Sequence, residues 1–483
     1  MKLSLLTRHL FFLSLCSSQL VAQPGTRLDE CLRLARERNI SIEQARRSLT
    51  ARQYQLRAEE VSYLPKLDLL AGYNYLGKPL EINLQTVRNG IVNGSSAQST
   101  AAAGEVFKEI TGNDMPQNVR DRIQQISKDA INGIYPNYNP PLSKQQYFTA
   151  ALGLRQPIYL GGKLNTARDI AKATYESGVV NVELVQKELD FLVAATYIRI
   201  LYLNTILRSQ AAIVEAMSKN EQYAAAMVKQ ELIPPYLRNW ATVALAQAIT
   251  RQHNQELEKT NALIEMRRLL QLPQDSALEI NDTLRYAVKS AVTVTDNFWL
   301  QNATYKSINS KTALAESAVK ASKSLSMPNI FGIASLNLYQ NDLPVTIPPW
   351  LVGVEAQWTI FSGLSNYRKR KATEQLVEEA RLAAENTKYL LQAGAAMAHN
   401  KVTALEKDIE VLNMARVQAQ TSTSLIQQRV KEELSSVKDV NESLLVEEEI
   451  GKTYYTAVLG YYLALAEYYN IIGTPEKIAS VIQ

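Results

Sequence analysis

The chain has 483 residues, of which 46% are hydrophobic and 20% charged, so it can bury a large core. The formal net charge is only +5 at pH 7, and the basic residues are interleaved with acids instead of clustered. So small a surplus, spread in this way, argues against a nucleic-acid-binding protein.

The N-terminus has the pattern of a secretory signal peptide, which we place at residues 1–22. Lys2 and Arg8 precede an apolar run at 10–15, and Ala22 is a small residue suited to cleavage. The run is too short to cross a bilayer as a helix, which needs about 20 residues. We therefore expect an exported chain from which the leader is removed.

Lipidation at Cys16 is the less favoured alternative, because Leu15 stands where an acylation site usually has a small residue. Cleavage would leave Cys31 as the single cysteine, so no intrachain disulfide is expected. No later segment has 18 consecutive uncharged apolar residues, so the sequence predicts no transmembrane helix. An exported chain of this kind is either soluble or enters a membrane as β-strands.

The strongest pattern in the sequence is an internal repeat, in which three landmarks recur at one offset of 202 residues. The pairs are 158–161 with 360–363, 228–232 with 430–434, and Pro273 with Pro475. The recurrence predicts a first repeat at 23–273, an equatorial connector at 274–301, a second repeat at 302–475 and a C-terminal tail at 476–483.

Each repeat is expected to begin with a helix that ends where a strand opens, at Leu64-Pro65 and at Met327-Pro328. These junctions are 263 residues apart, so the first repeat holds 61 residues that the second lacks, which is 263 less 202. The extra residues fall in a long inserted loop at 77–146. Within this loop we expect one short amphipathic helix at 116–130.

Four segments alternate apolar and polar residues with period two, which predicts strands at ~66–76, ~147–159, ~329–339 and ~350–361. Each has about ten residues, the length that a tilted strand needs to cross hydrocarbon. We expect four aromatic side chains at the membrane interfaces, Tyr73, Tyr75, Trp350 and Trp358. A soluble four-stranded sheet with one wet face gives the same alternation, so the strands alone leave that alternative open.

Long helical hairpins are predicted at 163–272 and 364–472, because neither contains a proline except Pro234-Pro235 at the tip of the first. Some 65 residues at about 1.5 Å each give a helix on the order of 100 Å long, which suits a tube of packed helices. The signal peptide, the repeat and the helix length together favour strands that cross a membrane.

Four strands cannot close a transmembrane barrel, since the smallest bacterial barrels have eight, and an open edge in lipid leaves backbone groups without partners. Several chains must therefore share one barrel if these strands enter a membrane. Three chains would give twelve strands, although the sequence itself leaves the number of chains open.

The layout resembles the TolC-like outer membrane efflux proteins, also called outer membrane factors, over essentially the whole mature chain. The resemblance rests on the tandem repeat, the two helix-to-strand junctions, the strand-exit segments 157–162 and 359–363, and the tip segment 434–440. That tip segment matches the Ser-x-x-Asp-Val signature of the family. The resemblance implies an α+β membrane protein in which a homotrimer shares a twelve-stranded β-barrel, four strands per chain, continued by a long α-helical barrel.

The implied function is an outer-membrane duct of a tripartite export system that passes small molecules, such as drugs and toxic compounds, to the exterior. The implied partners are a periplasmic membrane-fusion adaptor, an inner-membrane transporter and outer-membrane lipid. The implied localisation is the cell outer membrane, with extension into the periplasm. Two alternatives stay open, namely a duct for type I protein secretion and a periplasmic coiled-coil scaffold without a pore.

In the family an acidic pair in the second repeat narrows the periplasmic entrance and selects against anions, and the resemblance assigns these positions to Asp439 and Glu442. In a trimer each would form a ring of three carboxylates. The alternative is that two acids near a helix N-terminus simply favour the helix dipole.

The resemblance also places adaptor docking at the two hairpin tips. Glu231 and Glu433 stand where the family usually has glycine, and Leu237 replaces the signature aspartate at the first tip, so only the second repeat could supply an acidic ring. The expected docking residues are Glu231, Leu232, Pro234, Glu433, Leu434 and Ser435.

The sequence contains no recognisable catalytic constellation, so we expect neither an enzyme nor a cofactor or metal. The three histidines, His9, His253 and His399, are scattered along the chain. Gly161-Gly162-Lys163 follows a strand, but Leu164 stands where a phosphate loop needs serine or threonine.

Overall fold

The computed structural model describes residues 26–75, 84–111, 114–134, 146–287, 296–339 and 348–482. The chain divides into two compact units, of which unit 1 takes residues 1–47, 180–307 and 385–483, and unit 2 takes 48–179 and 308–384. Each unit draws segments from both halves of the sequence. The two repeats expected from the sequence are therefore not separate compact domains.

Unit 1 is built mainly of helices, and four long ones form two hairpins. They are α5 (Lys163–Lys229) with α6 (Pro235–Leu270), and α8 (Ser365–Lys431) with α9 (Val437–Ile471). Its shorter elements are α1 (Leu28–Arg38), η1 (Phe298–Gln301), η2 (Pro475–Ile478) and α10 (Ala479–Ile482). Both α5 and α8 have 67 residues, and they begin 202 residues apart.

The main core of unit 1 gathers apolar side chains from α1, the middle of α5, the end of α6 and the second half of α9. Ile198, Met266, Tyr461 and Tyr462 are among its largest fully buried members. In the described part of the chain α5 is the one helix long and apolar enough to cross a membrane, but 67% of its most apolar stretch is buried inside the protein. The apolar sequence of α5 thus serves the core.

The backbone enters the left-handed region at points that correspond between the two hairpins. Each non-glycine residue with positive φ in these turns has a partner 202 residues away that also has positive φ. The pairs are Gly161 with Gly363, Gly162 with Leu364, Glu231 with Glu433, and Gln271 with Gly473. The hairpins therefore start, turn and end with the same backbone conformations.

Two asparagines cap corresponding helices in unit 1. Asn39 separates α1 from α2 (Ile40–Glu60), and Asn302 separates η1 from α7 (Ala303–Ser324). In each case the side-chain amide donates to a carbonyl near the end of a hairpin, and the side-chain oxygen accepts from the N–H two residues on. The partners are Leu269 (2.9 Å) and Ser41 (2.9 Å) for Asn39, and Ile471 (2.9 Å) and Thr304 (2.8 Å) for Asn302.

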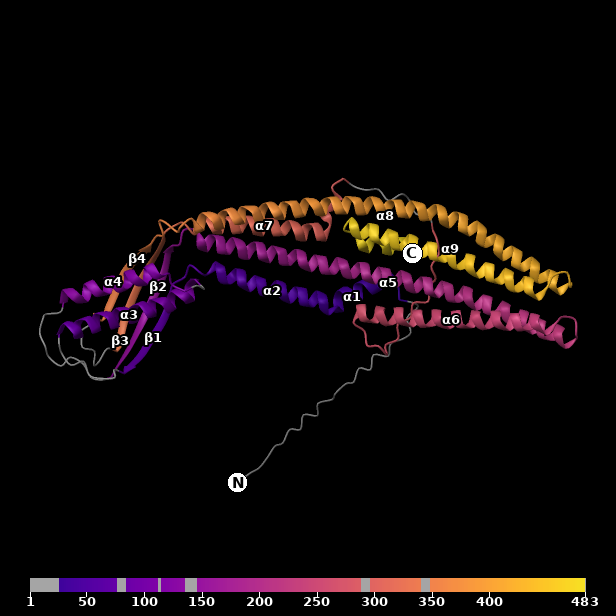
Figure 1. Ribbon diagram of the computed structural model, residues 1–483, viewed down its shortest axis with the longest axis horizontal. Coiled ribbons are helices and arrows are strands. Elements are labelled where there is room, and N and C mark those ends of the chain that lie inside the picture. Colours follow the sequence, from indigo (N-terminus) through magenta and orange to yellow (C-terminus); the bar gives the residue numbers. More distant parts are fainter. Residues whose placement is uncertain are drawn as a thin grey trace, which may run out of the picture. The chain divides into compact units, whose positions relative to one another are not determined.

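Unit 2 contains one antiparallel sheet with the strand order β1-β2-β3-β4 (Figure 1). The strands are β1 (Lys66–Tyr75), β2 (Gln146–Tyr159), β3 (Asn329–Tyr339) and β4 (Trp350–Gln357). The fourth strand is shorter than the expected 350–361, because it ends at Gln357 and leaves Trp358 just beyond the sheet. Parts of α2, α5, α7 and α8 complete the unit.

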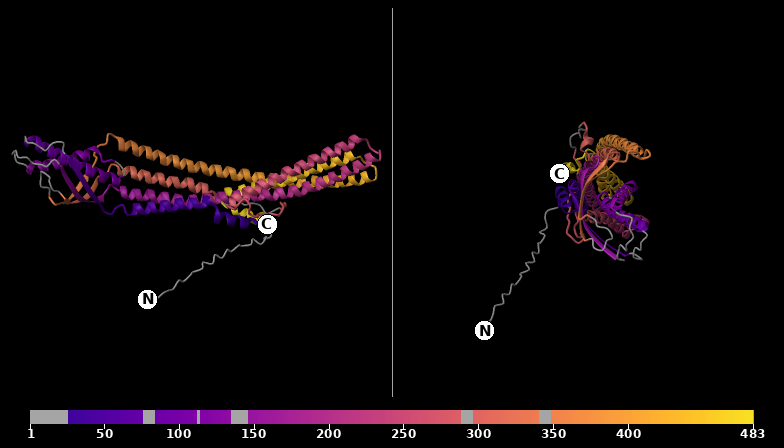
Figure 2. Two further views of the ribbon diagram at one scale, coloured as in Figure 1. Left: turned by 90° about the horizontal axis from the view of Figure 1, so that it is seen from below. Right: turned by 90° about the vertical axis from the view of Figure 1, so that its left-hand side faces the viewer.

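The expectation of a loop at 77–146 is wrong for most of this stretch, which contains α3 (Leu84–Thr111) and α4 (Gln117–Ile134). The expected helix at 116–130 coincides with α4. The sequence of α3 is rich in alanine, serine, glycine and threonine without a regular apolar stripe, so its helix was not foreseen. Phe107, Met115 and Val119 give α3 and α4 a small core of their own, and Figure 2 shows both helices beside the strands from two further sides.

Candidate membrane surface and helical tips

The register of the sheet places the four apolar faces expected from the sequence on one side. Leu69 pairs with Leu152, Leu152 with Leu336, and Leu336 with Trp350, so one apolar row crosses all four strands. We call this side the apolar face. Its members are Leu67, Leu69, Ala71, Tyr73, Tyr75, Phe148, Ala150, Leu152, Leu154, Ile330, Ala334, Leu336, Leu338, Trp350, Val352, Val354 and Ala356.

The apolar face is exposed, whereas the opposite side of the sheet, the polar face, is largely covered. Leu69 is 67% exposed and Val354 is 70% exposed. On the polar face Asp68, Thr149 and Glu355 are half-buried. This distribution is the reverse of what a sheet in water requires, because such a sheet hides its apolar side.

The aromatic residues expected at membrane interfaces lie at the two ends of the sheet. Tyr75 pairs with Gln146 at the start of β2, and Trp350 begins β4, so these two residues and Tyr73 belong to the same end. Trp358 follows the other end of β4, where its indole N–H donates to the carbonyl of Ser326 at 3.1 Å. Trp350 and Trp358 are eight positions apart, roughly 26 Å along the strand and roughly 20 Å along the axis of a barrel whose strands tilt by about 40°.

The tips of both hairpins carry the same C-terminal capping motif. At each tip one N–H bonds back over five residues and the preceding N–H over three, which is a Schellman motif with a left-handed residue. The bonds run from Leu232 to Met227 (2.9 Å) and Glu231 to Val228 (3.0 Å), and from Leu434 to Arg429 (2.8 Å) and Glu433 to Val430 (3.1 Å). Glu231 and Glu433 hold φ values of 61° and 60°, which explains why glycine suits these positions.

The second helix of each hairpin, α6 or α9, begins with a different N-terminal cap. Ser436 caps α9 by accepting from the N–H of Asp439 at 3.2 Å, and the Asp439 carboxylate accepts from the N–H of Ser436 at 2.7 Å. Pro234 precedes α6 and makes no side-chain cap. Leu232 and Leu434 are both exposed, so each tip presents an apolar side chain beside an acid.

The acidic residues assigned to the entrance have local partners within this chain. One carboxylate oxygen of Asp439 is bound in the capping box with Ser436. Glu442 lies 3.4 Å from Lys438, one turn earlier on the exposed side of α9. Asp439 is therefore part of the capping box of α9. Its second carboxylate oxygen stays available to solvent.

Near the tips the two hairpins are joined by buried polar side chains that sequence reasoning missed. The Asn220 amide donates to the Asn441 side-chain oxygen at 2.8 Å and to the Val437 carbonyl at 3.2 Å. The Tyr223 hydroxyl donates to the carbonyl of Val430 at 3.0 Å. A polar residue on an otherwise apolar helix face was the only signal in the sequence.

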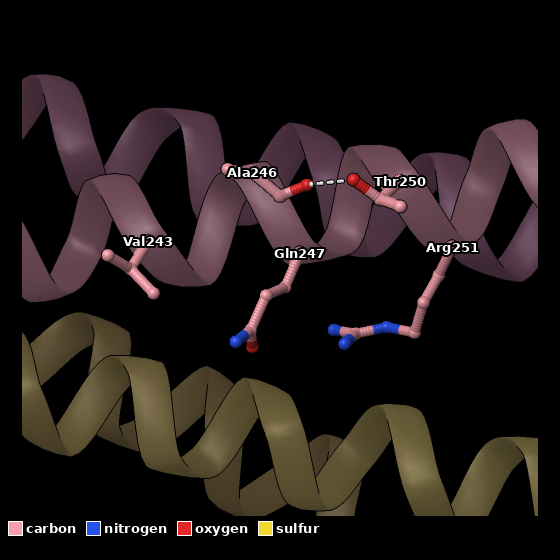
Figure 3. A pocket seen from close by; sticks show the side chains of 5 residues that line it. All are labelled: Val243, Ala246, Gln247, Thr250 and Arg251. Carbon is pink, nitrogen blue, oxygen red and sulfur yellow. Dashed lines mark hydrogen bonds between the residues drawn. The ribbon is translucent and has the colours of Figure 1, made fainter.

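A hollow of about 420 Å³ lies on α6 and is lined by Val243, Ala246, Gln247, Thr250 and Arg251 (Figure 3). Arg251 reaches toward α9, where its guanidinium bonds both carboxylate oxygens of Glu448 at 2.5 and 2.7 Å. The hydroxyl of Thr250 donates to the carbonyl of Ala246, inside the same helix. Both groups are therefore engaged within the protein.

Within the described ranges no three His, Cys, Asp or Glu side chains gather closely enough to hold a metal ion. Burial raises the pKa of the Cys31 thiol to about 12, so this cysteine carries no thiolate at neutral pH.

The structure is similar to solved outer-membrane proteins over nearly its whole length. The outer membrane protein VceC of Vibrio cholerae aligns with a TM-score of 0.69 at 13% identity, covering 92% of this chain and 96% of that one. The CmeC outer membrane channel of Campylobacter jejuni aligns with 0.70 at 14% identity, covering 92% and 85%. The MtrE outer membrane channel of Neisseria gonorrhoeae, in its open state, aligns with 0.68 at 15% identity, covering 93% and 89%.

No protein-family model matches the sequence, and no curated protein matches it either. The structural likeness confirms the fold of the TolC-like channels for the single chain, which is mostly helical with one four-stranded sheet. At these identities the likeness establishes the fold.

Proposed function

We propose that this chain is the outer-membrane duct of a tripartite export system, which passes small molecules from a periplasmic adaptor and an inner-membrane pump to the exterior. The observation that carries the proposal is the reversed sheet, whose apolar face is exposed and whose polar face is covered. Lipid would cover the apolar face without cost, whereas water would leave a large apolar patch unsatisfied. The fold shared with outer-membrane channel proteins supports the same function.

A homotrimer is the assembly that this sheet would need in a membrane. In the order β1-β2-β3-β4, the outer edges of β1 and β4 have no neighbouring strand among the described residues. Pairing β4 of one copy with β1 of the next would satisfy both edges, and three copies would close a barrel of twelve strands. The long hairpins would then continue this barrel as an α-helical tube in the periplasm.

The corresponding backbone turns and the two equal helices support an origin of the chain by internal duplication. Positive-φ residues recur at an offset of 202 at four points, and the capping asparagines recur at 263. The difference lies in α3 and α4, which only the first half contains. A cleaved leader at 1–22 would bring the chain to the outer membrane.

Adjacent residues of β4 provide the test of membrane insertion. Val352 is 69% exposed on the apolar face, and Leu351 is 55% exposed on the polar face. Val352→Arg would place a charge in lipid, at a cost of roughly 1–3 kcal/mol at that depth, and lower the yield of assembled protein in outer membranes. Leu351→Arg is the matched control and would assemble normally.

The measurement is the native mass of membrane-extracted protein in mild detergent, with the detergent mass subtracted. Three chains in the wild type and in Leu351→Arg, with loss in Val352→Arg, is the expected result. A soluble monomer, or equal assembly of both arginine variants, would refute the membrane duct and favour the scaffold without a pore.

Docking on an adaptor would use the exposed tips, with Glu231 and Leu232 at the first and Glu433 and Leu434 at the second. Their like charge and apolar neighbours suit a partner that presents basic and apolar side chains. Glu231→Lys combined with Glu433→Lys should abolish complementation of export while the trimer still forms. Normal export by this double variant would rule out docking through these acids. Pro234 and Ser435 complete the proposed surface.

The entrance role of the acidic pair is tested separately, because Asp439 also caps α9. Asp439→Asn keeps a capping side chain and removes the charge, and Glu442→Gln removes the second ring. We expect the double variant to lose preference for cations in planar bilayers with little change in stability. Unchanged ion selectivity would leave Asp439 as a helix cap alone.

A further inference from the structure

The polar face of the sheet is the side against which α3 lies. A Cβ added at Gly72 would lie 3.3 Å from the side-chain nitrogen of Gln98 in α3. At the end of the sheet from which α5 continues, the Lys66 ammonium donates to the carbonyl of Glu109 at 3.1 Å. Lys66 and Gly72 are both positions of β1 that belong to the polar face.

These two contacts show that α3 runs along most of the length of β1. Gln98 and Glu109 are separated by roughly 16 Å of helix, at about 1.5 Å per residue. Gly72 and Lys66 are separated by roughly 20 Å of strand, at about 3.3 Å per residue. The helix therefore covers the polar face lengthwise and is not confined to the rim of the sheet.

Arg155 of β2, which pairs with Lys66 of β1 and Ile333 of β3, also meets α3 on the polar face. Its guanidinium carbon lies 3.8 Å from the ring centre of Phe331 and 5.6 Å from that of Phe107 in α3. Glu355 of β4 lies 3.8 Å away, too far for a hydrogen bond. The side chain is buried, yet two of its guanidinium nitrogens have no hydrogen-bond partner.

The insert, defined as α3 and α4, is held together independently of the sheet. Its core consists of Phe107, Met115 and Val119, with Ala103 and Ile123 packed against them, and all five residues belong to 84–134. The contacts with the sheet are instead polar or cation–π. A body with its own core and a polar contact surface can leave the sheet without unfolding.

We propose that the insert is a displaceable plug that closes the duct at its outer-membrane end, latched to the wall by Phe107 over Arg155. The inference rests on the proposed function, because the polar face lines a lumen only if the strands of several copies share one barrel. The α3 helices of three copies would then lie inside that barrel.

The size of such a barrel leaves no open path beside three inserts. Twelve strands about 4.8 Å apart and tilted by about 40° enclose a diameter of roughly 24 Å. Three α3 helices, one from each copy and each about 10 Å across, need a surrounding circle of roughly 22 Å, so together they fill this barrel. The duct is therefore shut while all three inserts are in place.

The contact between Phe107 and Arg155 stabilises the closed state, but it also carries a cost that opening removes. Covered by α3, the Arg155 guanidinium has lost water and gained no hydrogen bond for two of its nitrogens. A buried donor without a partner is costly, and an open, water-filled lumen would satisfy it. The closed state is thus held by stacking on Phe107 and opposed by the hydration of Arg155.

The test is a reversible lock in the full-length chain. Gly72→Cys with Gln98→Cys places two thiols at facing positions of β1 and α3, and oxidation or a short bismaleimide would join them. Cys31 is buried and does not compete for the reagent. As a matched control, Ala103→Cys with Ile123→Cys joins α3 to α4 inside the insert.

The readout is single-channel conductance of the trimer in planar bilayers before and after locking. Locked at 72–98, the protein should lose its open events, and cleavage of a disulfide lock should restore them. Locked at 103–123, the insert can still move as one body, so open events should persist. Conductance that is the same whether the 72–98 lock is closed or reduced would overturn the plug.

A second variant removes the latch without any cross-link. Phe107→Ala should raise the frequency of open events several-fold, whether the insert merely loosens or loses its small core. Ile126→Ala truncates an exposed side chain of α4 and should leave gating unchanged. Equal gating by the two variants would also overturn the plug.

The two proposals fail in different ways. A trimer that conducts normally in every locked and unlatched form disproves the plug and leaves the duct intact. Absence of conductance in all forms, together with absence from the outer membrane, disproves the duct and the plug with it.

Discussion

In unit 1, α1 precedes the capping Asn39 and η1 precedes the capping Asn302. Different interactions attach these two elements to the long helices. In the first half Arg36 of α1 makes two bonds to the Asp190 carboxylate of α5, at 2.8 and 2.6 Å, and Asp190 is fully buried. The positions 263 and 202 residues later are Trp299 and Gln392. There Phe298 and Trp299 pack on α8 and α9, and Lys388 lies 4.8 Å from the Trp299 ring centre.

The comparison separates two kinds of position: those that a fixed backbone geometry requires, and those at which different side chains can make an equivalent packing contact. The turns and the two asparagines are the same in both halves because each serves a fixed backbone geometry. The attachment is a buried ion pair in one half and an aromatic cluster in the other, since either can fill the same space between helices. The following predictions test this division, beginning with the largest expected effect.

Removing the buried ion pair should destabilise the first half strongly. Asp190→Ala removes the buried carboxylate and both of its bonds to Arg36, whose side chain is 34% exposed, so we expect the free energy of unfolding to fall by about 2–3 kcal/mol. Gln392→Ala, at the corresponding position, should cost under about 1 kcal/mol. Denaturant unfolding in mild detergent, followed by circular dichroism, measures both. Similar losses at the two positions would contradict the division.

The two capping asparagines should be equivalent. Asn39→Ala and Asn302→Ala each remove a helix cap and leave a buried carbonyl without its donor, so each should lose about 2 kcal/mol. Asn39→Asp and Asn302→Asp keep the capping oxygen but turn a carboxylate oxygen toward the buried carbonyl, so they should cost at least as much as alanine. A large effect at one asparagine and none at the other would show that the corresponding hydrogen bonds do not contribute equally to stability.

The left-handed glutamates at the tips should show the smallest effect and the opposite sign. Glu231→Gly and Glu433→Gly relieve a residue with positive φ, so each should raise stability by up to about 1 kcal/mol. Val at either position should lower it, because a β-branched side chain tolerates this conformation poorly. Thermal unfolding of the four variants measures the change. Glycine variants that are more stable but export less would show that the acids are retained for docking.

Much of the fold could be predicted because it depends on period and spacing. Alternation assigned the correct residues to the apolar side of all four strands, and the register of Leu69, Leu152, Leu336 and Trp350 brings them into one row. The absence of interior proline predicted the long helices, which the structure places at α5 and α8. The end of β4 at Gln357 was missed, since alternation continues through Trp358 after the hydrogen bonds with β3 stop.

Helix α3 and the buried polar contacts could not be predicted, for the same physical reason. The apolar residues of the insert are few, and they stabilise it only once folding brings Phe107, Met115 and Val119 together in one cluster. Asn220 and Asn441 are likewise unremarkable until folding brings them within 2.8 Å of each other. The entrance and docking residues stay predictions, because their roles depend on partners outside the single chain.

By itself the sequence determined the twofold pattern, the length of the helices and the side of each strand that is apolar, whereas the export signal at 1–22 stays a prediction. These properties are local or periodic, and each follows from backbone geometry acting on neighbouring residues. Only the tertiary structure decided which face of the sheet is exposed and which is covered. That outcome depends on α3, whose contacts at Gly72 and Arg155 join residues far apart in the chain through interactions that no periodicity records.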